Sequence, residues 1–80
     1  MNEKQLYISF KSGVRLYIPE SQLKNSITVV LGQYRMACDI INANIFLIEM
    51  KDERRISLDT STIYNITCVE VEEWSNYLFI

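Results

Sequence analysis

Histidine is absent from this 80-residue chain, and cysteine, glycine and proline are scarce, with two cysteines, two glycines and one proline. Without histidine, the commonest general base and metal ligand is missing. Cys38 and Cys68 stand thirty positions apart, which matches none of the closely spaced pairs that zinc sites use. Glycines at positions 13 and 32 alone cannot form a phosphate-binding loop. We therefore expect no enzyme activity, no cofactor and no metal, and we expect both thiols to be buried, reduced and passive.

Long uncharged runs are also missing. The most lightly charged stretch, residues 29–50, is interrupted by Arg35, Asp39 and Glu49, so it lacks the roughly 18 uncharged residues of a membrane helix. The N-terminal residues lead directly into alternating sequence, without the basic and apolar regions of a signal peptide. An apolar fraction of 49% is too high for a disordered chain. The sequence thus predicts one small cytoplasmic domain over residues 1–80, with no membrane contact.

Two runs of alternating apolar and polar residues, 6–10 and 14–18, predict a β-hairpin. A three-residue loop, Lys11 to Gly13, pairs Phe10 with Val14 and puts the apolar residues of both strands on one face, whereas a two-residue loop would oppose Phe10 with Arg15. The longer loop also places Gly13 where a bulged turn needs a left-handed residue. We therefore predict the three-residue loop, with Val14 facing the core.

The middle of the chain allows two interpretations. Residues 27–31 are rich in β-branched side chains and predict a strand. Residues 33–42 fit a helix through the spacing of Tyr34, Ala37, Cys38 and Ile41, and they fit a strand through alternation at 36–40. The strand is favoured because loops at 42–44 and 52–54 would align three strands, 36–40, 46–50 and 56–58, on one apolar face. That alignment sets Met50 against Ile56 and Ile48 against Leu58.

Turn-forming residues at 59–62 predict a turn, followed by a short 3₁₀ segment at 63–65 and a last strand at 66–71. No internal repeat is evident. The expected fold is all-β and mainly antiparallel, a small barrel or meander with short helical turns. This order of strands and one 3₁₀ turn resembles SH3-like and Sm-like barrels, a resemblance that implies no function. The alternative is an α+β fold with one helix at about 33–42.

The predicted hairpin carries aromatic and basic residues on its outer face. Tyr7 and Tyr17 should form a cross-strand pair there, beside Arg15 and with Lys11 close by. Such a pair can simply stabilise the hairpin, it can belong to a protein interface, or its rings can stack on the bases of single-stranded nucleic acid while the cations bind phosphate. The net charge of −2 weighs against nucleic acid.

The C-terminal residues form a second candidate surface. Trp74 is followed by a run of four apolar residues that includes Tyr77 and Phe79. This segment either folds onto the core as a final strand or docks on another chain, where buried aromatics contribute most of the binding energy. We predict that residues 74–80 contribute to a homodimer or to a partner complex.

Short, β-rich, acidic chains without catalytic residues resemble the accessory proteins of bacteriophages and other mobile elements. That resemblance covers no specific motif, and it implies a protein that binds and blocks a larger host protein. The sequence therefore predicts a non-catalytic binding protein that acts through protein–protein interaction, as an inhibitor of a host protein. The alternative is a small-barrel module for single-stranded nucleic acid.

Overall fold

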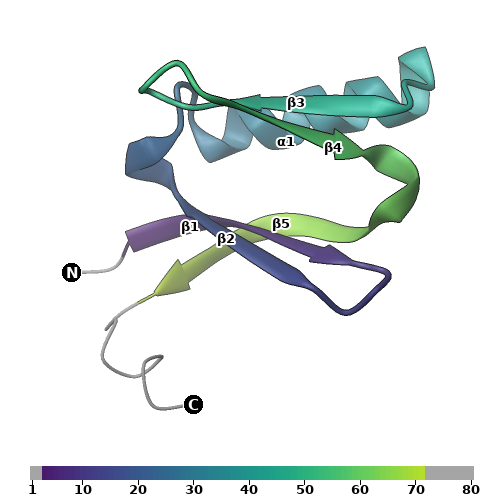
Figure 1. Ribbon diagram of the computed structural model, residues 1–80. Coiled ribbons are helices and arrows are strands. Elements are labelled where there is room, and N and C mark those ends of the chain that lie inside the picture. The colour runs from purple at the N-terminus through teal and green to yellow at the C-terminus, as the bar shows by residue number, and fades with distance from the viewer. Residues whose placement is uncertain (1–2, 72–80) are drawn as a thin grey trace.

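The computed structural model describes residues 3–71, which form two layers (Figure 1). The lower layer is an antiparallel sheet of strand order β2-β1-β5, and the upper layer contains the β3-β4 hairpin and helix α1. The elements in chain order are β1 (Glu3–Phe10), β2 (Arg15–Pro19), η1 (Glu20–Gln22), α1 (Ile27–Met36), η2 (Ala37–Ile41), β3 (Ile45–Glu49), β4 (Arg55–Asp59), η3 (Thr60–Thr62) and β5 (Ile63–Val71).

The first hairpin has the predicted register. Leu6 lies opposite Ile18 and Ile8 opposite Leu16, and the Phe10 amide donates to the Val14 carbonyl oxygen at 2.9 Å. Gly13 has a φ of +95°, so the left-handed turn residue is confirmed. Val14, however, is exposed, so its predicted place in the core is wrong; it lies beside the exposed loop, before β2 begins at Arg15.

The second hairpin differs from its predicted register by two residues. Phe46 pairs with Leu58 and Ile48 with Ile56, and the loop is 51–53 in place of 52–54. The loop shifts because the Met50 amide donates to the Arg54 carbonyl oxygen at 2.9 Å while Glu53 takes the left-handed conformation, with φ +68°. Asp52 supports this turn, since its carboxylate accepts from the Arg54 backbone amide at 3.1 Å.

The two hairpins are one structural unit that occurs twice, forty residues apart. Residues 10 and 50 directly precede equivalent three-residue loops, and each second strand leads into a 3₁₀ turn, η1 or η3. The units bind each other reciprocally: the Lys11 amide donates to the Thr62 carbonyl oxygen and the Lys51 amide to the Gln22 carbonyl oxygen, both at 2.9 Å. The chain therefore contains a structural repeat that the sequence analysis missed, because few side chains are identical between the copies.

The repeat provides a matched pair of turn variants. Gly13→Val should lower the free energy of unfolding by about 1–2 kcal/mol, because a Cβ is penalised at positive φ, even though no atom lies within 4 Å of the added Cβ. Glu53→Gly should raise it by about 0.5–1 kcal/mol for the same reason. Chemical denaturation measures the free energy of unfolding of both variants. A change of the same sign and size in both would contradict the prediction.

Helix α1 and the π-helical segment η2 replace the predicted strands at 27–31 and 36–40. The preference for strands was wrong because local capping outweighs the β-branched side chains. The Ser26 hydroxyl accepts from the Val29 amide at 3.3 Å, and the Glu20 carboxylate accepts from the Ile27 amide at 3.0 Å; both satisfy amides of the first helical turn. The alternative helix at 33–42 is right in kind, although the helix begins at Ile27.

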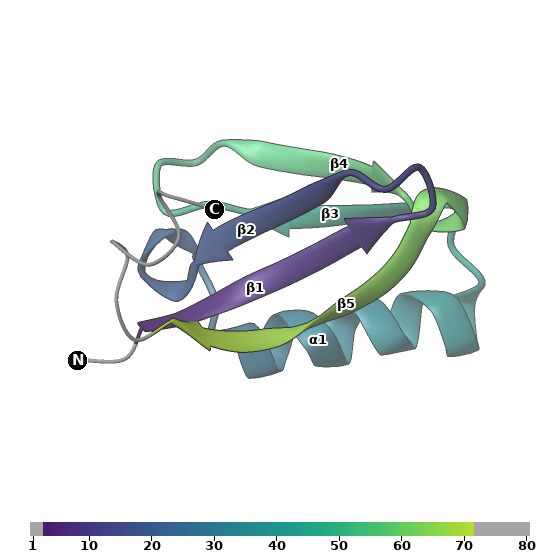
Figure 2. The same cartoon turned by 90° about the horizontal axis from the view of Figure 1, so that it is seen from below.

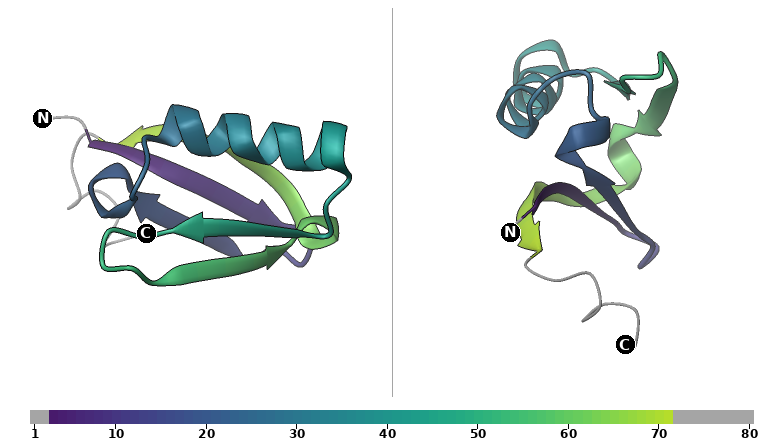
Figure 3. Two further views of the ribbon diagram at one scale, coloured as in Figure 1. Left: turned by 90° about the horizontal axis from the view of Figure 1, so that it is seen from above. Right: turned by 90° about the vertical axis from the view of Figure 1, so that its left-hand side faces the viewer.

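The core lies between the two layers, seen from below and from above in Figures 2 and 3. Its side chains come from all five strands, from α1 and from the residues that directly follow η1 and β3. They are Leu6, Ile8, Ile18, Leu23, Ile27, Val30, Phe46, Ile48, Met50, Leu58 and Ile63. Among residues 3–71 the sheets stay open, so a closed barrel is not formed, and the 3₁₀ turn lies at 60–62 in place of 63–65. The fold is small, dominated by antiparallel strands, with one helix.

Candidate binding surfaces

The tyrosine pair forms as predicted. Tyr7 lies opposite Tyr17, with ring centroids 4.9 Å apart and an interplanar angle of 46°. Tyr17 is exposed and Tyr7 half-buried. Arg15 is two residues from Tyr17 on the same strand, so both side chains point to the same face, whereas Lys11 lies in the exposed loop. The pair and Arg15 are therefore brought together, and Lys11 is set to one side.

The other predicted binding residues, Trp74, Tyr77 and Phe79, lie outside the described residues. Their role in an interface stays a prediction.

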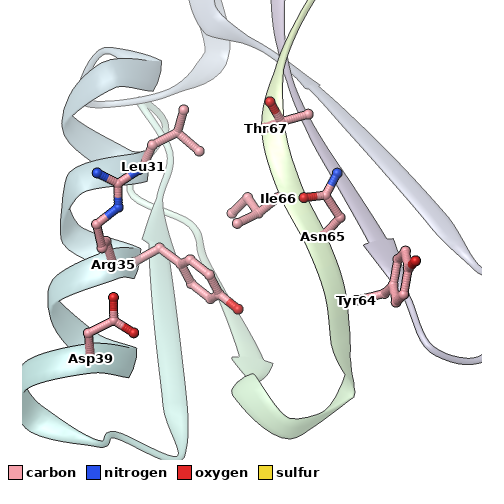
Figure 4. Close-up of a pocket in the computed structure, with 8 residues that line it drawn as sticks. Leu31, Arg35, Asp39, Tyr64, Asn65, Ile66 and Thr67 are labelled. Carbon is pink, nitrogen blue, oxygen red and sulfur yellow. The ribbon is translucent and has the colours of Figure 1, made fainter.

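A cavity of about 340 Å³ lies between α1 and β5 (Figure 4). Burial, followed by a hydrogen bond with Cys38, raises the pKa of the Tyr34 hydroxyl on its wall to about 12, so this group keeps its proton at neutral pH and can donate but not act as a base. This cavity could not be predicted from a strand interpretation of residues 27–31 and 36–40, because its wall is formed by α1 and η2. The lining residues are Leu31, Tyr34, Arg35, Asp39, Tyr64, Asn65, Ile66 and Thr67.

The two thiols are free and partly exposed, which corrects the expectation that both are buried. Cys68 packs against the core from β5, while Cys38 lies in η2 and is half-buried. Within residues 3–71, no three histidine, cysteine, aspartate or glutamate side chains group into a metal site. No helix in the described part of the chain is long and apolar enough to cross a membrane.

Most of the exposed large apolar side chains in the described part of the chain come from the upper layer, and we call this set the α1–β3 face. It consists of six exposed apolar side chains from α1, η2 and β3, each between 45% and 73% exposed: Val29, Met36, Ile40, Ile41, Ile45 and Leu47. Val29, Met36 and Ile40 are seven and four positions apart, a spacing that aligns them along one side of the helix. The α1–β3 face is the largest gathering of exposed large hydrophobic residues in the described part, where Val14, Tyr17 and Tyr64 are the others.

Strand β3 contributes two of the six residues of this face, Ile45 and Leu47. Phe46 and Ile48 point into the core, so the alternation of a strand sends Ile45 and Leu47 to the opposite side. A half-solvated antiparallel strand normally has polar residues there, whereas a strand with apolar residues on both faces is typical of one covered from both sides. Seen from above, α1 and β3 both belong to the upper layer (Figure 3), and the rings of Tyr34 and Phe46 link them, with centroids 5.2 Å apart.

No family model, no curated protein and no solved structure matches this chain. Its surfaces are therefore interpreted from their own chemistry.

Proposed function

We propose that this chain is a non-catalytic protein-binding domain, and that the α1–β3 face is the surface it uses. The observation that carries the proposal is the apolar character of β3 on both sides, continued by the exposed stripe of α1. Contiguous exposed apolar surface of this kind is typical of sites that dock another protein. That the partner is a host protein which the chain inhibits stays a prediction.

A photo-crosslinking amino acid at position 40 tests this proposal in cells that produce the chain. Position 40 is 73% exposed within the α1–β3 face, and position 14, at 60% exposed, is a matched control outside it. We expect a discrete crosslinked protein from position 40 and none from position 14. No adduct from position 40, or the same adducts from both positions, would contradict the proposal.

The tyrosine pair supports a second candidate function, the binding of single-stranded nucleic acid. Two adjacent rings beside Arg15 can stack on bases while the guanidinium binds phosphate, and the observed ring distance of 4.9 Å brings both rings to one site. This candidate ranks second because the chain's net charge is −2, and phosphate binding depends on positive charge.

Replacing both Tyr7 and Tyr17 with serine tests the second candidate. The parent protein should bind a labelled oligothymidine at low salt, with an affinity that falls steeply as salt is added. The double variant should lose the stacking contribution to binding, about 1–3 kcal/mol per base. Fluorescence anisotropy measures both effects. A parent protein that binds no oligonucleotide at low salt would end this candidate.

A further inference from the structure

Helix α1 and segment η2 are apolar on more than the side that faces the core. Ile27, Val30 and Tyr34 pack into or against the core, and Val29, Met36 and Ile40 are exposed on another side. The only charged residues of this helical stretch, Arg35 and Asp39, both line the cavity beside β5. A surface helix normally carries polar or charged residues opposite its core side, whereas here an apolar stripe is exposed beside the polar residues Thr28 and Gln33.

The exposed apolar area approaches what a dimer needs. Six large side chains, each about half to three-quarters exposed, present on the order of 500 Å² of apolar surface, the upper part of the range for the largest patch on a monomer. With its uncharged neighbours Gln33, Asn42 and Asn44, which are also exposed, the face comes near the roughly 800 Å² per partner of a standard specific interface.

The charge pattern favours a second copy of this chain as the occupant. None of the six residues is charged. The exposed charged neighbours on the same side of the β3-β4 hairpin, Glu49, Arg55 and Asp59, include both signs, so two identical faces can meet across a two-fold axis with opposite charges at the rim. An 80-residue chain also buries a smaller share of its surface than a larger domain does, and association adds to its stability.

We infer that this chain forms a homodimer in which the α1–β3 faces of two copies pack against each other. The inference rests on the proposed protein-binding function and names its partner. The dimer covers Ile45 and Leu47 with apolar surface from the partner, which gives β3 a second covered face, and it removes the α1 stripe from water.

Sedimentation velocity from low micromolar to millimolar protein tests the dimer. We expect the parent chain to shift from monomer to dimer over this range, and Leu47→Glu and Ile40→Glu each to weaken dimerisation by about 100-fold, as expected for a central interface position. Val14→Glu, which adds the same charge at an exposed site outside the face, should leave dimerisation unchanged. Circular dichroism melts of all three variants establish that each is folded; if Leu47→Glu unfolds, Leu47→Ser replaces it.

Two results would overturn the inference. One is a parent chain that stays monomeric at millimolar concentration; the other is a dimer that Val14→Glu weakens as much as Leu47→Glu does. A monomeric parent whose position 40 still crosslinks to one different protein would remove the second copy as partner and leave the protein-binding function in place. A monomeric parent without any adduct from position 40 would remove both.

Discussion

Replacing Ile48 with alanine should destabilise the protein by about 2–5 kcal/mol, and replacing Ile8 should cost a similar amount. The two residues occupy equivalent positions forty residues apart, one in each hairpin, and their side chains are 1% and 0% exposed. Each truncation loses the burial of the side chain and leaves a cavity in the one core that both layers share. Thermal or urea unfolding measures the loss.

Comparing Ile48→Ala with Ile8→Ala tests whether both hairpins belong to one cooperative core. Leu47→Ala provides a control beside Ile48, since Leu47 is about half exposed on the opposite face of the same strand, and its effect on a dilute sample should stay below about 1 kcal/mol. A small effect of Ile48→Ala together with a large effect of Ile8→Ala would show that the β3-β4 hairpin is not part of the cooperative core.

Replacing Gln5 with methionine should stabilise the protein by about 1–3 kcal/mol. Gln5 is 0% exposed, and neither its amide nitrogen nor its amide oxygen has a hydrogen-bond partner. A buried polar group without a partner loses its bonds to water and gains none in return. Methionine has a similar length and shape without the two orphaned atoms, so the desolvation cost disappears while the packing is retained.

Gln22→Met is the matched control, because Gln22 is exposed and its side chain has no desolvation cost to recover. Chemical denaturation of both variants measures the difference. A Gln5→Met variant that is less stable than the parent would show that the amide is satisfied in solution.

The sequence predicts the first hairpin in detail because two constraints coincide there. Alternation fixes which residues face the core, and Gly13 fixes the position of the positive φ. In the second hairpin the same turn is formed with Glu53 at positive φ. Glutamate gives no signal for that conformation, and face matching alone allows a register shifted by two residues, since alternation is preserved.

The helix could not be chosen from periodicity alone. Ile27, Thr28, Val29 and Val30 are β-branched and favour strands in isolation, and the signals that decide for the helix are Ser26 at the N-cap and the Glu20 carboxylate, seven positions before the amide it binds. Once α1 is a helix, Val29, Met36 and Ile40 align on its outer side. The α1–β3 face was missed because it depends on this element, whereas the tyrosine pair was found because it depends only on the first hairpin.

The most direct measurement of the central claim, that the α1–β3 face is covered by another protein chain, is the oxidation rate of Met36. Met36 lies in the face and is 53% exposed, while Met50 is buried in the core at 7% and serves as an internal reference. Mild peroxide treatment followed by mass spectrometry, at low micromolar and at millimolar protein, gives both rates in one sample. We predict that Met36 is oxidised several-fold more slowly in the concentrated sample while Met50 is unchanged. Equal Met36 rates at the two concentrations would contradict a face that a second copy covers.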